Sequence, residues 1–326
     1  MSLKVFAMKK TFTEFEKFFY RYIFPKLEPV EVLRRKVVTR GTFVFILFSL
    51  LLLASYLLVY HTEMLETNKP NKVFLLSGFG VLVVGFIVGS YVVDFKSFRS
   101  SFKSIVVEPI ITFINPDLNY NPEGFVNQDT FNFSRIFLHY PNRYKGEDLV
   151  LGKIGNANVK MSEVEALYVV KSGGKKKYES IYNIFSGLLF AADFGVEFHK
   201  STIIIPRSDI PDVFTKKAHR ERSEVLMEID CPDFSSHFAV YSEDANETQR
   251  LLTKPFLQRI IDLNRKHSGK VYLSFVGSYL FIAISKTDNL LEPPLFKNLT
   301  RIESVKPYFE QVQQLTSLLF DLNPSQ

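Results

Sequence analysis

The stretch that decides the architecture is TFVFILFSLLLLASYLLVY, residues 42–60, which carries no charged side chain. At a rise of about 1.5 Å per residue, a helix over this stretch nearly covers a hydrocarbon core of roughly 30 Å. A cleaved signal peptide is the alternative. It fits poorly, because the run begins far from the N terminus, exceeds the usual apolar core of a signal peptide and has no small-residue cleavage site after it. We therefore expect a transmembrane helix.

A second apolar run, VFLLSGFGVLVVGFIVGSYVV, covers residues 73–93 and follows the short polar link HTEMLETNKPNK. Two runs joined so closely predict a transmembrane hairpin over residues 42–93. Basic flanks are retained in the cytoplasm, and Lys and Arg gather at both outer ends of this hairpin: Arg34, Arg35, Lys36, Arg40, Lys96, Arg99 and Lys103. Both termini are therefore expected to be cytoplasmic.

Small residues mark one stripe of the second run. Gly85 and Gly89 form a GxxxG step, and Gly78 lies one heptad before Gly85. Such a stripe allows the backbone of another helix to approach closely. The partner helix can belong to the hairpin itself or to another copy of the chain, and a span that merely tolerates glycine is the third interpretation.

The net charge of +6 is confined to the N-terminal leader, residues 1–41, which hold ten Lys and Arg against four Asp and Glu. The rest of the chain is therefore neutral, which argues against nucleic acid as a partner. Cys231 is the only cysteine, so an intrachain disulfide framework is excluded and a reducing compartment fits.

The leader also has an amphipathic pattern. Phe12, Phe15, Phe19 and Tyr22 recur at helical spacing, and Pro25 is expected to close the helix. Such a helix can lie in the membrane interface or dock on the soluble domain.

After the hairpin, residues 94–123 keep a helical period and predict an amphipathic connector that is kinked at Pro109 and ends at the turn Asn115-Pro116-Asp117. Residues 124–326 then predict a cytoplasmic α+β domain with a mostly antiparallel sheet and a packed C-terminal helix. The expected strands are residues 148–154, 159–170, 178–190, 202–205, 225–229, 238–241, 271–275 and 279–284. The expected helices are residues 246–267, split at Pro255, and 307–322.

The turn between two of these strands, residues 171–177, has the sequence KSGGKKK. Its lysines, Lys171, Lys175, Lys176 and Lys177, are predicted to meet the anionic inner leaflet, to which each Lys can add on the order of 1 kcal/mol. The alternative is a solvated turn, since lysines are common at exposed tips.

Motifs that carry chemistry are missing from the sequence. There is no HExxH or paired-Cys pattern, no phosphate-binding GxxxxGK[ST] loop and no GxSxG elbow. Glu147, Asp148 and Asp193 supply carboxylates for acid/base work, but a structural role is the simpler interpretation of Asp193, which follows an apolar stretch. No catalytic residue, metal site or cofactor is therefore predicted, and a non-enzyme is favoured.

Several stretches resemble one known family in their order along the chain. They are SRIFLHYPNRYKGEDLVLGKIGN (residues 134–156), IFSGLLFAADF (residues 184–194), FAVYSEDANETQRLLTKPFLQRIIDL, VYLSFVGSYLFIAIS and the closing LFDLN. The chain resembles the bacterial membrane protein family known as domain of unknown function 3137. The resemblance implies a two-span protein of the bacterial inner membrane with a cytoplasmic domain, and it supplies no catalytic residues.

We therefore expect a membrane-anchored cytoplasmic scaffold or binding module that serves envelope or membrane-protein homeostasis. Its expected partners are membrane lipids and either further copies of the chain or another membrane protein. Two other classes stay open: a membrane-surface hydrolase without a recognisable motif, and an accessory subunit of a transport or secretion complex.

Overall fold

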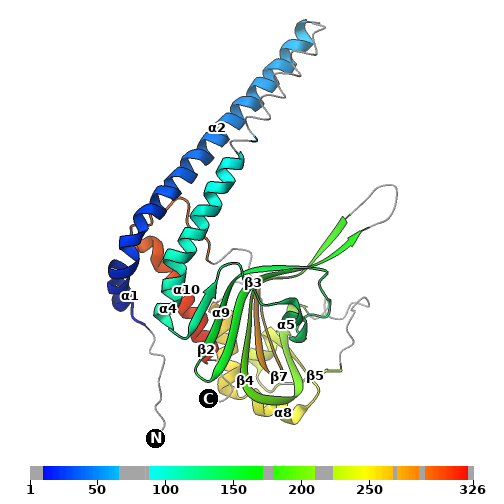
Figure 1. The fold of residues 1–326 in the computed structure, drawn as a ribbon. Helices are drawn as coiled ribbons and strands as arrows, with labels where there is room; N and C mark the ends of the chain where they lie inside the picture. Colours follow the sequence, from blue (N-terminus) through cyan, green and yellow to red (C-terminus); the bar gives the residue numbers. More distant parts are fainter. Residues whose placement is uncertain are drawn as a thin grey trace. The chain divides into compact units, whose positions relative to one another are not determined.

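The computed structural model describes residues 10–65, 85, 88–171, 179–209, 223–266, 270–285 and 291–321. The chain divides into two units. The helical unit comprises Thr11–Pro109 and Glu292–Pro307, and the sheet unit comprises Met1–Lys10, Ile110–Leu291 and Tyr308–Gln326. Figure 1 shows their elements along the chain.

The helical unit begins with a capped helix. The Thr11 hydroxyl accepts a hydrogen bond from the backbone N–H of Glu14 at 3.2 Å, and the Glu14 carboxylate accepts one from the backbone N–H of Thr11 at 2.8 Å. This reciprocal pair satisfies N–H groups that have no partner within the helix. Helix α1, Phe12–Phe18, continues through a π-helical turn, Phe19–Ile23, and a 3-10 turn, Phe24–Lys26, into α2, Leu27–Leu65.

The prediction that the leader helix closes at Pro25 is wrong, because the chain stays helical through this proline. A proline inside an α-helix removes one hydrogen bond and clashes with the carbonyl four residues earlier. Here a π-helical turn directly precedes Pro25, and π-turns replace the ordinary bonding pattern locally. Pro109 follows a second π-turn, Lys103–Val107, between the helical residues 88–102 and α4, Glu108–Ile114.

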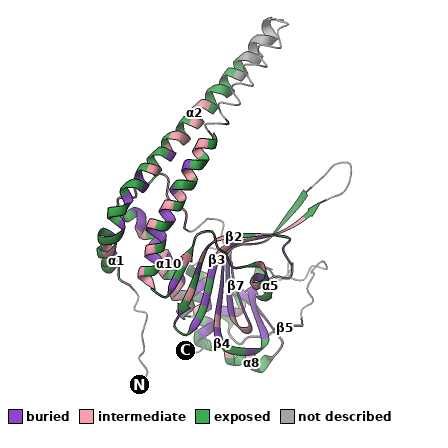
Figure 2. Ribbon diagram, in the orientation of Figure 1, coloured by how far each residue is buried: buried purple, intermediate pink, exposed green. Residues whose placement is uncertain are grey.

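Among the described residues, one helix, Phe12–Ala54, is long and apolar enough to cross a membrane. Only 6% of its most apolar window is buried, and Phe45 is 71% exposed. The core helix of a soluble protein would instead be mostly buried. Figure 2 shows exposed and half-buried residues along this part of α2. The second predicted span, residues 73–93, falls mostly outside the described residues.

The described strands of the sheet unit form one antiparallel sheet, so the predicted α+β class is confirmed. Their order is β1-β2-β3-β4-β6-β5, and β7 pairs with β4. The strands are β1 Leu118–Asn121, β2 Arg143–Ile154, β3 Ala157–Lys171, β4 Glu179–Pro206, β5 Val225–Met227, β6 Phe238–Ser242 and β7 Val271–Ser285.

Two pairs of predicted strands are in fact single bent strands. Strand β4 has 28 residues and joins the strands predicted at 178–190 and 202–205, with register shifts between Asp193 and Thr202. Strand β7 runs through Gly277, where a turn was predicted, and Gly277 pairs with Phe198. Gly277 has φ +61°, a conformation that glycine adopts without strain, so the strand bends there and continues.

Helices and one aromatic cluster complete the sheet unit. The core places Phe131, Phe137, Phe185 and Tyr272 together, with Phe131 and Phe137 stacked at 5.1 Å between ring centroids. The remaining helices are α5 Gln128–Phe133, α7 Pro232–His237, α8 Ala245–Leu251, α9 Lys254–Lys266 and α10 Ile302–Asp321. The C-terminal helix therefore begins five residues before the predicted start, Pro307, which lies inside it.

Candidate functional site: the base of the membrane helix

The described part of the helical unit brings α2 close to the helix formed by residues 88–102. A Cβ atom added to Gly41 would lie 3.0 Å from Cε2 of the Tyr91 ring. The two helices can therefore approach this closely because Gly41 has no side chain. This contact was not predicted, since Gly41 belongs to no glycine repeat.

Asp94 adds a charged contact between the same two helices. Its carboxylate is 2.8 Å from the Lys36 ammonium and also bonds the Arg40 guanidinium, and its side chain is only 9% exposed. Two of the basic residues used to predict the orientation are therefore also structural. The acid was overlooked because it directly follows the second apolar run.

A third segment, residues 292–301 (EPPLFKNLTR), fastens onto α2, and we call it the strap. The buried carboxylate of Glu31 accepts hydrogen bonds from Arg34 Nη2 at 2.7 Å and from the backbone N–H of Leu299 at 3.1 Å. Arg34 Nη1 donates in turn to the carbonyl oxygen of Leu295 at 2.5 Å. The strap is thus held to α2 at two points, four residues apart.

The first residue of the strap contacts the other helix. The Glu292 carboxylate is 2.6 Å from Arg99 Nε and 3.3 Å from Nζ of Lys103, whose side chain is 3% exposed. The strap therefore ties both helices together at the base of the apolar helix. Its groups are paired ions and backbone hydrogen bonds, which suit holding and orienting a helix rather than bond-breaking chemistry.

The structure leaves the glycine stripe without a close neighbour. A Cβ atom added to Gly85 or Gly89 would meet no atom within 4 Å. Gly78 lies outside the described residues. A contact of this stripe within the hairpin therefore receives no support from the described residues, and a contact between copies stays a prediction.

The strand ends on either side of the predicted lysine turn form a projecting two-stranded arm, which Figure 1 shows beside the sheet. Strand β2 pairs with β3 only as far as Leu167, so the pairs from Tyr168 with Tyr182 to Lys171 with Glu179 have no third strand in the described sheet. Ile181 is 55% exposed and Tyr182 59%. Lys171 ends β3, whereas Lys175, Lys176 and Lys177 lie outside the described residues.

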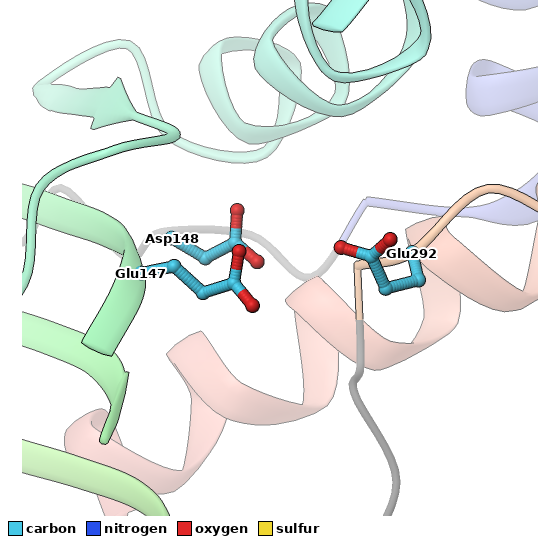
Figure 3. Close-up of side chains that lie close together, drawn as sticks. All are labelled: Glu147, Asp148 and Glu292. Atoms are coloured by element: carbon cyan, nitrogen blue, oxygen red, sulfur yellow. The ribbon is translucent and has the colours of Figure 1, made fainter. Parts of the chain in front are cut away.

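The carboxylates predicted as acid/base candidates have structural surroundings. Asp148 is buried at a bulge of β2, has φ +61° and accepts a hydrogen bond from the Tyr120 hydroxyl. Asp193 accepts one from the backbone N–H of Gly195 at 3.0 Å, as expected of a structural acid at a strand bend. Figure 3 draws Glu147 and Asp148 together with Glu292. Because Glu292 belongs to the helical unit, we assign these three carboxylates to no common site.

A further polar group joins the end of β4 to the start of β7. Asp209 accepts hydrogen bonds from Lys270 Nζ and the Tyr272 hydroxyl, each at 2.5 Å. Burial on its own would raise the pKa of Asp209, but the hydrogen bonds from Lys270, Tyr272 and Ser208 outweigh it and hold the pKa below its ordinary value. These bonds hold the end of β4 and the start of β7 together.

Comparison with known proteins identifies a family. Residues 183–324 match the family described as Protein of unknown function (DUF3137). This match confirms the predicted family over residues 183–324 and does not test its membrane and bacterial aspects. The DUF3137 match begins within β4. It includes β7, which pairs with β4, and the strap, which is bonded to α2. No curated protein sequence matches the chain.

One solved structure is similar in part: the crystal structure of the mycobacterial trehalose monomycolate transport factor A, TtfA. It is 13% identical, with a TM-score of 0.34, and the alignment covers 68% of this chain and 94% of that one. A likeness of this size carries no argument about ligand or mechanism.

Proposed function

We propose that this DUF3137 protein is a membrane-anchored scaffold or binding module, with α2 as its anchor. The observation that carries the proposal is the exposure of the apolar helix. Only 6% of an 18-residue apolar stretch of this helix is buried. Soluble proteins rarely expose an apolar patch larger than a few hundred Å². Lipid is the environment that such a helix requires.

The base of this helix supports a scaffold rather than a loose tether. Glu31 and Glu292 hold the strap to the two helices, and Asp94 joins the helices to each other. The chain also passes between the helical unit and the sheet unit at four places: after Lys10, Pro109, Leu291 and Pro307. Both units are therefore built from segments that are separated in the sequence.

The finer features of the proposal are two spans, cytoplasmic termini and association between copies through Gly78, Gly85 and Gly89. Among the described residues, the space beside Gly85 and Gly89 is open to another helix. The process that we propose for it is envelope or membrane-protein homeostasis.

The test of the anchor is alkaline carbonate extraction of membranes that contain the full chain. We expect the protein to stay in the membrane pellet, because carbonate releases proteins held only by charge. A matched variant, Leu50→Arg with Leu53→Arg, should be largely extracted, since each Arg near a helix centre costs about 2.5 to 3.5 kcal/mol. Extraction of the unchanged chain would overturn the proposal.

A further inference from the structure

The strap carries an aromatic side chain with little protein around it. Phe296 is 87% exposed, more than Phe45 on the apolar run at 71%. Lys297 follows it and is also exposed. Exposing a whole Phe side chain to water costs on the order of 1.5 to 3 kcal/mol relative to burying it, so an environment that covers Phe296 would be favourable.

The hydrogen bonds of the strap place this turn along α2. Leu295 is bonded to Arg34, and Leu299 is bonded to Glu31, which lies further from the apolar run. The Arg34 guanidinium also bonds the Glu31 carboxylate, so Leu295 and Leu299 are held by one ion pair on this part of α2. Before Leu295, Glu292 lies beside Arg99 and Lys103. Phe296 directly follows Leu295, which is bonded to Arg34, and Figure 1 shows the loop before α10 arching beside α2.

The distance from this turn to the membrane follows from helix geometry. Arg34 precedes Thr42, where the apolar run begins, by eight residues, which is about 12 Å of helix. The headgroup layer extends the hydrocarbon core by roughly 5 to 8 Å on each side. The remaining gap is about the length of one or two extended residues, so Phe296 can reach the headgroup layer with its ring.

We propose that the turn formed by Phe296 and Lys297 lies in the headgroup layer of an anionic leaflet and is a second membrane contact beside α2. The proposal rests on the membrane crossing proposed above. Aromatic rings are enriched at membrane interfaces, and amphipathic surfaces that lie there combine Phe with Lys and Arg.

The charges around the turn favour lipid over a protein partner. Arg35 is 68% exposed and Lys36 45%, whereas their carboxylate partners Glu31 and Asp94 are 5% and 9% exposed. Glu31 is shared by Arg34 and Arg35, and Asp94 by Lys36 and Arg40, so each carboxylate balances only one of its two basic partners. With Lys297 added, the net charge of this group is positive. An anionic surface attracts each such residue by about 1 kcal/mol.

The experiment measures how close the turn lies to the headgroups in the full chain. In a Cys231→Ser background, Lys297→Cys is labelled with a polar fluorophore, and the protein is placed in nanodiscs of phosphatidylglycerol and phosphatidylcholine with a nitroxide on some headgroups. Thr42→Cys and Lys17→Cys are the matched controls. Lys17 precedes Thr42 by 25 residues of helix, which is about 37 Å for an α-helix.

We expect quenching at residue 297 to be at least half of that at residue 42. Quenching at residue 297 should weaken in discs of phosphatidylcholine alone. It should fall at least twofold when Phe296→Ser is added. Residue 17 should be unquenched. If residue 42 is quenched and residue 297 behaves like residue 17, the strap contact is wrong and the membrane helix stands. If residue 42 is also unquenched, the proposed membrane crossing fails and the strap contact fails with it.

Discussion

Glu31 is the residue that joins the strap to α2. Its side chain is 5% exposed and bonds Arg34, Arg35 and the backbone of Leu299. Glu31→Ala would leave the half-buried Arg34 without its carboxylate partner and the buried N–H group of Leu299 without its acceptor. Breaking a fully buried ion pair from one side costs about 3 to 5 kcal/mol. We expect a loss of this order in thermal unfolding in mild detergent. The control Glu28→Ala, at an exposed position of the same helix, should change little, and equal effects would contradict this role of Glu31.

Asp209 makes the stability of the sheet unit depend on pH in the acid range. Its pKa is lowered in the folded protein, because hydrogen bonds from Lys270, Tyr272 and Ser208 outweigh the effect of burial. A lowered pKa contributes stability above the ordinary Asp value of about 3.9, and this contribution is lost as the pH falls through the folded-state pKa.

Asp209→Asn should therefore lower the free energy of unfolding by about 1 to 3 kcal/mol at pH 6. The difference between the variant and the unchanged protein should shrink below pH 4. Urea unfolding followed by near-UV circular dichroism at both pH values measures it. A difference that grows on acidification would have the wrong sign for this account.

At the scale of elements, two kinds of glycine contact can be separated. Gly41→Leu should push the Tyr91 ring away and destabilise the helical unit, because overpacking costs about 1 to 3 kcal/mol.

Gly85→Leu with Gly89→Leu should leave the unfolding temperature of the monomer unchanged and reduce the oligomer size in detergent, because these positions face open space. Unchanged oligomer size would show that the stripe faces lipid.

The lysine turn of the β3–β4 arm gives a second test at this scale. If Lys175, Lys176 and Lys177 meet an anionic leaflet, trypsin should cleave after them more slowly in phosphatidylglycerol discs than in phosphatidylcholine discs. High salt should restore the rate, because the Debye length shrinks from about 10 Å at 0.1 M to about 3 Å at 1 M. Equal rates in the two lipids would favour a solvated turn.

Periodicity in the sequence predicted the kinds of elements well and their ends less well. The apolar face of α9, with Phe256, Leu257 and Ile260 buried, follows directly from spacing. Gly277 was read as a turn between two strands, because a glycine with positive φ inside a strand looks the same in sequence as a turn. The residues between the strands predicted at 178–190 and 202–205 were likewise left out of the sheet. Pro25 and Pro307 were read as ends of helices, but neighbouring π-helical bonding or tertiary packing overrides that local preference.

Only the basic half of the charged residues at the base of α2 was predicted. Its basic residues were recognised from their position beside an apolar run, but their acidic partners were not. The spacing of Glu31 to Arg34 and Arg35 is a helix-pair signal that could have been used. Glu292 is 193 residues from Arg99, and a pairing at that separation depends on the whole fold.

At the scale of the whole molecule, the pairing of these charges bears on orientation. The positive-inside rule counts Lys and Arg near a span and gives little weight to Asp and Glu. Neutralisation of Lys36 and Arg40 by Asp94, and of Arg99 by Glu292, therefore leaves the predicted orientation unchanged. Both ends of the proposed hairpin still carry the basic flanks.

This orientation predicts that Cys231, which belongs to the sheet unit and is half-buried, is cytoplasmic. Intact cells treated with a membrane-impermeant thiol reagent should leave Cys231 unlabelled, and labelling should appear after lysis and mild unfolding. A matched control, Asn71→Cys in a Cys231→Ser background, reports on the link between the two apolar runs. That link should be labelled in intact cells, because a hairpin with cytoplasmic ends exposes its connection outside. Labelling of Cys231 in intact cells would reverse the orientation, whereas an unlabelled residue 71 together with an unlabelled Cys231 would show that the second run does not complete a hairpin.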